Sequence, residues 1–418
     1  MIIEVRVKNS YVFTNAVTLK LKADMRQKKF GFNIFSYENI NILKSLGVYG
    51  PNNVGKTSLL KSIRNIRDVI LNKKSQMNHN IFTGSPIVEL GISFLEMENI
   101  ISYDFKYNNK EKEFIYEKLT KIEKDQYGNE KEKIILLRDT VLKEYYFEDK
   151  TIETMMKLIS GNNILIHLIN ETESSSLKSI KYTLLDFASK IDYVDMNNIP
   201  IQKTIDLLKN KNNIQTKIVN FILHADLDLD DFKYNEKADI ERNISISNKE
   251  TPEEKVLDIP DRVIDQIRLT SVYRGQEVPS IFFDSTGTKK IVALSSYIIE
   301  ALEFGKILII DELDSSIHFK LARAIVAMFN NELNKRAQLI FSVHDINLMD
   351  CKKLMRKEQI WFVHKDKKGV YLYSLSDFTA SDGVRDTTDI IEKYKKGILG
   401  AIPEPQLINS LLEIEHGK

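Results

Sequence analysis

The sequence has a single cysteine, no long hydrophobic run and almost no net charge. Cys351 is the only cysteine among 418 residues, so no internal disulfide can form, and this favours a reducing compartment. Apolar runs such as residues 307–310 are far shorter than the ~20 residues that span a bilayer. Residues 2–7 are too short and too charged for a secretory signal. We therefore expect a cytoplasmic protein without membrane contact.

Positive and negative side chains balance closely. Lys and Arg number 60, and Asp and Glu number 59, which gives no global electrostatic argument for binding nucleic acid. The basic side chains of residues 351–418 make that segment locally positive, which fits either a solvated surface or a contact with a phosphate backbone. The same segment is too short for a nuclease domain and has no clustered acids or His/Cys ligand spacing. Any nucleic-acid cleavage would therefore come from a partner.

Residues 50–58 form a complete GxxxxGK[ST] pattern between a short apolar run (residues 42–49) and a segment with helical spacing. In such a strand–loop–helix unit, backbone N–H groups surround the phosphates, the lysine reaches the terminal phosphates and the following hydroxyl ligates Mg²⁺. The residues expected to bind nucleotide are Gly50, Pro51, Asn52, Asn53, Val54, Gly55, Lys56, Thr57 and Ser58. A chance match is the alternative for so short a pattern.

A second motif makes a chance match a poor explanation. The apolar residues 306–310 lead into Asp311 and Glu312, and a central parallel strand delivers acids to the phosphate-facing edge of a sheet in this way. We expect Asp311 to serve a Mg²⁺ site together with Thr57, and Glu312 to act as the general base that polarises water. Together with Lys56, these residues predict hydrolysis of a nucleoside triphosphate.

Two further segments fall in the order that such a site needs. Residues 339–343 form another buried strand, which is followed by His344. One helix, at about residues 316–333, separates it from the acidic strand, so a right-handed crossover places His344 beside the acids and near the γ-phosphate. Ser285, Thr286 and Gly287 precede an apolar helix at residues 291–304. Taken alone, that cluster is only a helix N-cap.

In this order, the four motifs resemble those of the ATP-binding-cassette (ABC) and structural-maintenance-of-chromosomes (SMC) ATPases, in which the signature of one subunit covers the γ-phosphate bound to another. The form Ser-Thr-Gly-Thr at 285–288, the run 311–318 and the ending 394–403 resemble more closely the stand-alone AAA-family ATPases of the AbiL/RloA kind. The resemblance implies an α/β fold, with an ABC/SMC-like P-loop ATPase head, a mixed sheet and an inserted, largely helical lobe. It also implies ATP and Mg²⁺ as cofactors.

The resemblance also assigns roles to individual residues. Lys56, Glu312 and His344 would be catalytic, with His344 as the switch. The residues that would act between subunits are the signature residues Ser285, Thr286 and Gly287 and the communicating-loop residues Asp314 and Ser315. The glutamine that usually links the Mg²⁺ site to the inserted lobe has no assigned position. Gln76 is the nearest candidate, in surroundings that do not fit.

Three functions are consistent with these motifs. The resemblance implies an ATP-hydrolysing switch in abortive-infection defence against phage, which forms a homodimer or higher oligomer and controls a separate nuclease-like or toxic effector. The alternative is a DNA-repair or recombination ATPase of the SMC/RecF-like kind, which would need DNA-stimulated turnover and a strongly salt-dependent contact with DNA. A scaffold with negligible turnover is the third, and the acidic residue Glu312 argues against it.

The long separation of Thr57 from Ser285 predicts an insert within the ATPase head. We expect the first part of the head at 1–150, an inserted, mainly helical lobe at 151–240, the second part of the head at 241–350 and a C-terminal extension of strands plus a helix at 351–418. Alternation at residues 101–107 indicates strands that belong to the head, whereas apolar spacing of three and four within 201–222 indicates helices. No heptad run predicts a coiled-coil arm.

Overall fold

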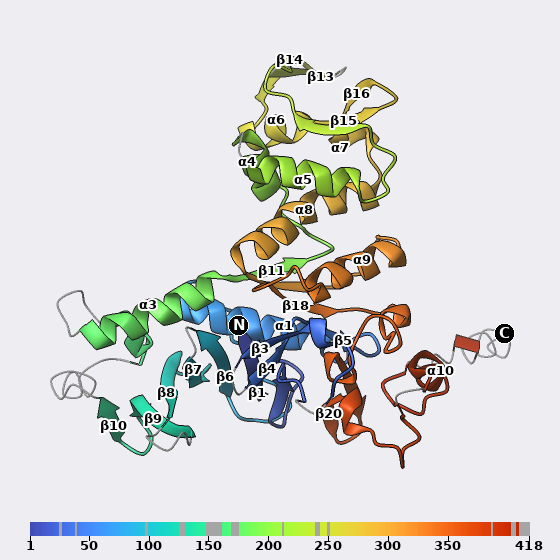
Figure 1. Cartoon of the computed structure of the whole chain (residues 1–418). Coiled ribbons are helices and arrows are strands. Elements are labelled where there is room, and N and C mark those ends of the chain that lie inside the picture. The colour runs from blue at the N-terminus through green and yellow to red at the C-terminus, as the bar shows by residue number, and fades with distance from the viewer. Residues whose placement is uncertain are drawn as a thin grey trace, which may run out of the picture.

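The elements of the chain form a broad body and a narrower lobe that rises from it (Figure 1). The computed structural model describes residues 1–24, 27–37, 40–96, 99–124, 130–147, 161–168, 175–210, 213–238, 243–248, 251–385, 388–402 and 407–408. The body contains a mostly parallel sheet and a large antiparallel sheet. The long helix α8 (Thr286–Phe304) runs from the lobe down to the body.

The parallel sheet has six strands in the order β11-β17-β18-β5-β19-β20. All neighbouring pairs are parallel except β19 with β20. Every position of β5, β17 and β18 is buried, as expected for strands that are covered on both faces. The strands are β5 (Ser45–Tyr49), β11 (Ile191–Asp195), β17 (Ile307–Asp311), β18 (Gln338–Ser342), β19 (Ile360–Asp366) and β20 (Gly369–Ser374).

The connection between β17 and β18 confirms the crossover expected from the sequence. Helix α9 (Phe319–Asn330) joins the two strands, which pair in parallel from Ile307 with Gln338 onward. β18 therefore lies between the acidic strand β17 and the phosphate-loop strand β5. Because the carboxyl ends of parallel strands meet at one edge of a sheet, the residues that follow β5, β17 and β18 converge there.

One expected strand is two strands in the structure. The apolar run at residues 42–49 divides at Lys44 into β4 (Ile40–Leu43), which pairs with β3 (Ile34–Tyr37), and β5 in the parallel sheet. Lys44 is buried at this change of sheet, and its Nζ donates to the Asn331 carbonyl oxygen at 2.8 Å. The expectation of one strand was wrong because the apolar character of the run does not show that its two halves pair with different strands.

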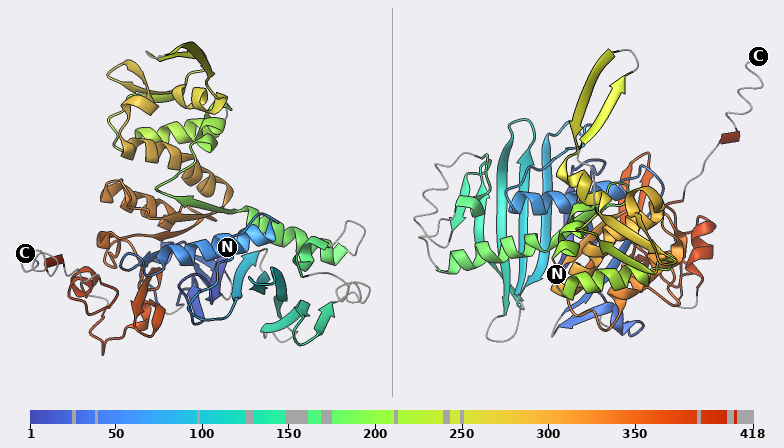
Figure 2. Two further views of the ribbon diagram at one scale, coloured as in Figure 1. Left: turned by 180° about the vertical axis from the view of Figure 1, so that it is seen from behind. Right: turned by 90° about the horizontal axis from the view of Figure 1, so that it is seen from above.

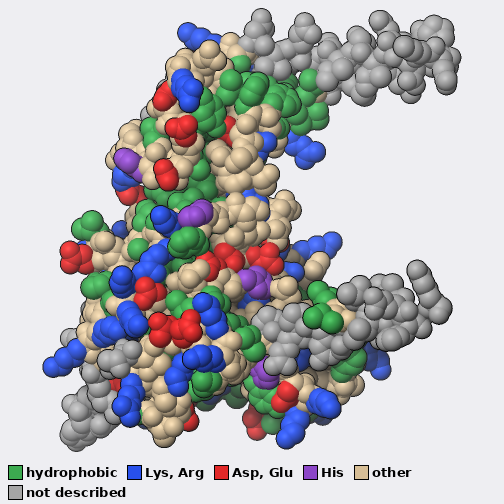
Figure 3. All heavy atoms as spheres, turned by 90° about the vertical axis from the view of Figure 1, so that its right-hand side faces the viewer, with side chains coloured by type: hydrophobic (Ala, Val, Ile, Leu, Met, Phe, Trp, Pro, Cys, Tyr) green, Lys and Arg blue, Asp and Glu red, His purple; other side chains and the backbone are tan. Residues whose placement is uncertain are grey.

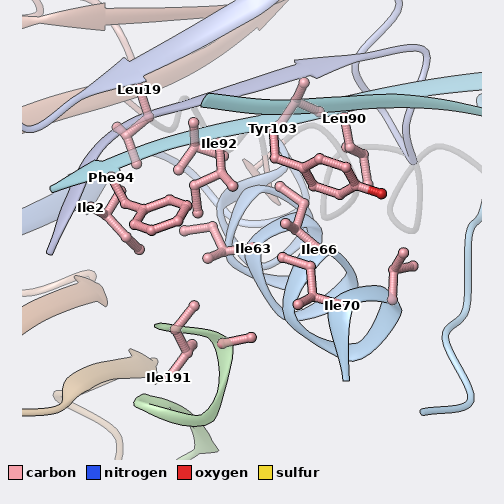
Figure 4. Packing of buried hydrophobic residues seen from close by; sticks show 14 of the residues in the cluster. Ile2, Leu19, Ile63, Ile66, Ile70, Leu90, Ile92, Phe94, Tyr103 and Ile191 are labelled. Atoms are coloured by element: carbon pink, nitrogen blue, oxygen red, sulfur yellow. The ribbon is translucent and has the colours of Figure 1, made fainter. Parts of the chain in front are cut away.

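The antiparallel sheet packs against helix α1 (Lys56–Ile70). Ile63, Ile66 and Ile70 recur at helical spacing and are fully buried, and they lie on the side of α1 that faces the sheet, near Ile92 and Phe94 (Figure 4). This core fixes the direction in which α1 leaves the phosphate loop. In sheet order, the strands are β10 (Glu144–Phe147), β9 (Glu130–Asp139), β8 (Glu113–Lys124), β7 (Asn99–Asn108), β6 (Ile87–Glu96), β1 (Ile2–Lys8) and β2 (Val17–Lys20).

The lobe packs short helices and a three-stranded sheet against α8, with contacts that extend from Val292 to Glu303. Ile205, Leu208, Ile218 and Ile222 form a buried cluster with Val292 of α8. A hairpin of β13 (Asn243–Asn248) and β14 (Thr251–Asp258) projects from the lobe (Figure 2). The other elements of the lobe are α4 (Gln202–Lys209), α5 (Asn213–Leu223), β12 (Asp231–Tyr234), α6 (Asp261–Ile267), β15 (Leu269–Tyr273), β16 (Gln276–Pro279) and α7 (Ser280–Phe283).

The segment expected to form the insert contributes to both parts of the molecule. Of residues 151–240, α3 (Ser175–Ser189) and β11 lie in the body, whereas α4, α5 and β12 lie in the lobe. β11 is a strand of the parallel sheet within a segment expected to be mainly helical. The boundary near residue 150 lies outside the described residues, and the division into four domains stays a prediction.

Short elements complete the chain. They are η1 (Gly31–Asn33), η2 (Leu165–Leu168), η3 (Ile346–Leu348), η4 (Lys357–Gln359), η5 (Leu375–Asp377) and α10 (Ile390–Lys395). Strands β19 and β20 and helix α10 correspond to the strands and the last helix that the sequence predicts after residue 351. Within the described part of the chain, no helix has the length and apolar character needed to cross a membrane.

Candidate nucleotide-binding site

The phosphate loop lies between β5 and α1, and its glycines are required by its geometry. Gly50 has φ 145° and Gly55 has φ 121°, values that favour glycine. A Cβ atom on Gly50 would lie 2.3 Å from the Val363 carbonyl oxygen, and one on Gly55 would lie 2.5 Å from Cγ2 of Val12. The loop is therefore packed tightly on its protein side. Its backbone at the start of a 15-residue helix has the arrangement that binds phosphates.

Lys56 is buried at the centre of the site. Its Nζ donates to the carbonyl oxygens of Gly50 at 2.7 Å and Pro51 at 2.8 Å, and it lies 3.5 Å from Nδ1 of His344. Burial lowers the pKa of Lys56 to about 8, while nearby acids oppose that shift. These two loop acceptors are neutral, so a triphosphate would offer the ammonium group stronger partners.

Asp311 is held by hydroxyl groups from three other elements. Its Oδ1 accepts from Thr57 at 3.1 Å and from Ser342 at 2.5 Å, and its Oδ2 accepts from Tyr193 at 3.3 Å. Burial and the Asp311 charge raise the pKa of Tyr193, so the phenol keeps its proton and its role as donor. Thr57 and Asp311 are thus adjacent oxygen donors at the end of the phosphate loop. Such a pair fits Mg²⁺, which usually takes one or two protein ligands together with phosphate oxygens.

Glu312 follows β17 in a left-handed backbone conformation. Its φ is 59°, and its N–H donates to Oγ of Ser342 at 2.8 Å. Its Oε2 accepts from Nδ2 of Asn197 at 2.7 Å, and Oδ1 of Asn197 accepts from Oγ of Ser315 at 3.1 Å. The strand-end turn therefore directs Glu312 away from its neighbour Asp311 and toward the loop that follows β11.

Asn197 is a site residue that the sequence reasoning missed. It lies just after β11, which pairs with β17 in a register that sets Asp195 opposite Asp311. Gln76, the candidate for the linking glutamine, lies elsewhere, because its carbonyl oxygen accepts from Tyr11 at 3.1 Å and Asn65 at 3.0 Å. Asn65 is about 13 Å along α1 from Lys56 at the usual helical rise, so Gln76, which Asn65 contacts, is remote from the phosphate loop. A polar residue directly after an additional strand was the signal that could have identified Asn197.

Asp314 and His344 meet across the ends of β17 and β18. Oδ2 of Asp314 accepts from the backbone N–H groups of His344 at 2.9 Å and Asp345 at 2.8 Å. Partial burial and the charge of Lys56 lower the pKa of His344, so its imidazole is neutral at neutral pH. The structure thus places His344 at the end of the strand beside the acidic strand, as the expected crossover requires, and 3.5 Å from Nζ of Lys56.

The structure places the signature residues at the start of α8, against the loop at residues 315–316 of the same chain. Ser285 caps α8 by accepting from the Thr288 N–H at 3.1 Å, so the simple capping role is present. A Cβ atom on Gly287 would lie 2.8 Å from the Ser316 carbonyl oxygen. Lys290, one turn further, donates to the carbonyl and hydroxyl oxygens of Ser315 at 3.2 and 3.1 Å. The signature therefore packs on the loop that follows Glu312.

A cavity of about 310 Å³ lies behind the signature, where the lobe meets the body. Thr286 and Lys290 of α8 line one side of it, and Asn197 lines another. The cavity therefore lies between the capping turn of α8 and the loop after β11, whose Asn197 donates to Glu312. Its remaining lining includes Met196, Ile199, Ile201, Leu269, Ile281 and Val292.

The fold and the site together define a P-loop ATPase head with a mixed α/β architecture. The phosphate loop after β5, the acidic residues at the end of β17 and the histidine after β18 meet at one edge of the parallel sheet. β18 lies between the other two strands. The chain belongs to the family described as "AAA domain, putative AbiEii toxin, Type IV TA system", whose model matches residues 45–350. The match covers most of the head, from the phosphate-loop strand to the residues after His344.

Solved structures include two similar chains, both of SMC heads. One is the SMC head domain from Thermotoga maritima, with 12% identity, a TM-score of 0.42, and coverage of 89% of this chain and 98% of that one. The other is the SMC head bound to the C-winged helix domain of ScpA, with 13% identity, a TM-score of 0.44, and coverage of 92% of this chain and 99% of that one. No curated protein sequence matches the chain significantly.

Proposed function

We propose that this protein hydrolyses ATP and uses the bound nucleotide as a switch that controls a separate effector in defence against phage. The convergence of Lys56, Thr57, Asp311 and Glu312 at one sheet edge carries the proposal, because hydrolysis needs a phosphate anchor, a metal site and a base in one place. A protein that only binds nucleotide needs no carboxylate in the position of Glu312.

Each residue has a distinct task in the proposed reaction. The backbone of residues 50–58 and the Lys56 ammonium bind the phosphates, and Glu312 accepts the proton of the attacking water. Thr57 and Asp311 would hold Mg²⁺, which when bound neutralises charge on the phosphate oxygens. The neutral imidazole of His344, 3.5 Å from Lys56, would contact the terminal phosphate and distinguish ATP from ADP.

The position of the signature supports a dimer in which each subunit completes the site of the other. Ser285 and Thr286 are exposed at the start of α8, and Gly287 packs on the loop at Ser316. In the proposed dimer, Ser285 would gain a phosphate partner from a second chain. ATP would join two heads, and hydrolysis would release or reset them, which is a switch governed by the γ-phosphate.

The effector part of the proposal is supported by the family and by the distribution of charge. The AbiL/RloA resemblance implies abortive infection, and the matched family is described with the AbiEii toxin and type IV toxin–antitoxin systems. On the described part of the face in Figure 3, Lys and Arg are interspersed with Asp and Glu and form no continuous positive surface for a phosphate backbone. A protein effector suits such a surface better than DNA does.

Substitution of the general base tests the proposal. Glu312→Gln keeps the size of the side chain and removes its basicity, so turnover is expected to fall about a hundredfold while ATP stays bound. Steady-state phosphate release and binding of a fluorescent ATP analogue measure the two properties separately. Lys56→Ala is the matched control, because it should impair nucleotide binding itself. Wild-type turnover by Glu312→Gln would contradict the assignment, and turnover that rises sharply with DNA would favour a repair function.

A further inference from the structure

The side chain of Asn197 joins the proposed general base to the loop at Ser315. Its Nδ2 donates to Oε2 of Glu312 at 2.7 Å, and its Oδ1 accepts from Oγ of Ser315 at 3.1 Å. The amide nitrogen therefore donates to the carboxylate, and the amide oxygen accepts from the hydroxyl group, as each partner requires. Asn197 comes from the loop after β11, whereas Glu312 and Ser315 follow β17.

The contacts continue to the signature helix. Nζ of Lys290 on α8 donates to Oγ of Ser315 at 3.1 Å and to Oγ of Ser316 at 3.1 Å. Ser315 donates to Asn197, and Asn197 donates to Glu312. The three successive hydrogen bonds from Lys290 to Ser315, from Ser315 to Asn197 and from Asn197 to Glu312 thus all run toward the carboxylate. Hydrogen bonds that run in one direction polarise and strengthen one another.

The side chain of Asn197 is not needed to form its own loop. The Asn197 backbone N–H donates to Oδ1 of Asp195 at 2.9 Å, and the Asn198 N–H donates to the Asp195 carbonyl oxygen at 2.9 Å. Asp195 itself is fixed by β11, which is parallel to β17. The turn is therefore built by Asp195 and the backbone, and the exposed amide of Asn197 is free to act on Glu312.

We infer that Asn197 is a positioning residue for Glu312 and that it links the position of this carboxylate to the signature helix through Ser315 and Lys290. The inference rests on the proposed role of Glu312. A glutamate side chain has three rotatable bonds, and a base that samples many rotamers seldom lies within hydrogen-bond reach of the attacking water. A second subunit that engages Ser315 or α8 would act on the same chain of hydrogen bonds.

Steady-state kinetics of substitutions at position 197 test the inference. Asn197→Asp keeps the shape but places a second carboxylate against Glu312, so kcat for ATP is expected to fall about tenfold to a hundredfold, with KM changed less than about twofold. Asn197→Ala should lower kcat in the same way. Asn197→Gln keeps the amide and should recover most of the loss. Asn198→Ala is the matched control in the same turn, and it should behave as the wild type.

A double substitution tests the link to Ser315. If Ser315 acts on Glu312 only through Asn197, then Asn197→Ala with Ser315→Ala should have the same kcat as Asn197→Ala alone. Wild-type kcat for Asn197→Asp and Asn197→Ala, with Glu312→Gln inactive, would overturn the inference and leave the proposed function intact. A rise in KM at constant kcat would also overturn it, because Asn197 would then serve nucleotide binding. Wild-type turnover by Glu312→Gln would overturn the proposed function as well.

Discussion

Among the described residues, the Lys56 ammonium group donates to two carbonyl oxygens and lies 3.5 Å from the imidazole of His344, and burial lowers the pKa of Lys56 to about 8. ATP binding needs the charged form, so above pH 8 the free protein must take up a proton to bind. We expect the affinity for ATP to fall up to about tenfold for each pH unit above 8. Titration of a fluorescent ATP analogue at pH 7, 8 and 9 measures this slope.

Two variants separate Lys56 from other titrating groups. Lys56→Arg carries a guanidinium that stays charged over this range, so its affinity should be nearly constant from pH 7 to 9 even where it is weaker. Lys44 is also buried with a pKa lowered to about 8, but it lies at the opposite end of β5. Lys44→Met should therefore keep the wild-type slope. An equal slope in Lys56→Arg would show that another group is responsible.

Among the elements, strands β8 and β9 are joined by a buried ion pair. Nη2 of Arg138 lies 2.5 Å from Oε2 of Glu117, and neither side chain is exposed. Glu117 also accepts from Tyr103 at 2.8 Å and from the Leu165 N–H at 3.0 Å, so the pair ties the strands to the segment that contains η2. Burial raises the pKa of Glu117, and Arg138 opposes this shift.

Removal of one partner of this pair should destabilise the body of the molecule. Glu117→Ala leaves Arg138 buried without a counter-charge, and we expect a loss of about 3–5 kcal/mol in the free energy of unfolding. The double substitution Glu117→Leu with Arg138→Met should recover most of that loss, because no charge then remains buried. Urea unfolding followed by circular dichroism measures both. A double variant as unstable as Glu117→Ala would show that the hydrogen bonds to Tyr103 and Leu165 matter more than the charges.

The elements around the site differ in how well the sequence predicts them. β17 and β18 are continuous apolar runs, and the unit at Lys56 has the glycine-containing pattern of a phosphate loop. The local sequence alone therefore indicates these elements. β11 is short, carries Asp192 and Asp195, and owes its place to parallel pairing with β17 far along the chain. Asn197 was missed because its contacts with Glu312 and Ser315 depend on that pairing. The structure also separates β4 from β5, where composition alone indicates one strand.

At the scale of the whole molecule, the proposed dimer would complete each nucleotide site with the signature of a second chain. α8 begins in the lobe, whereas Lys56 lies in the body, and the contacts of Gly287 and Lys290 are with the loop at residues 315–316. A subunit without a working phosphate loop therefore still carries an intact signature. This arrangement makes the proposed dimer testable by mixing inactive variants.

Lys56→Ala and Ser285→Arg should each be inactive alone and active when mixed. Ser285 is exposed, so a large side chain there is expected to block the dimer-completed site while the monomer folds, at a cost of about 1 kcal/mol for the lost cap. In an equal mixture, half of the dimers are mixed and one of their two sites is complete, so turnover should reach about a quarter of the wild-type rate. Lys56→Ala mixed with Glu312→Gln is the control. Both of those residues serve the nucleotide of their own chain, so no complete site can form and no activity should return. Recovery in the control, or none in the first mixture, would contradict a signature that acts on the partner's nucleotide.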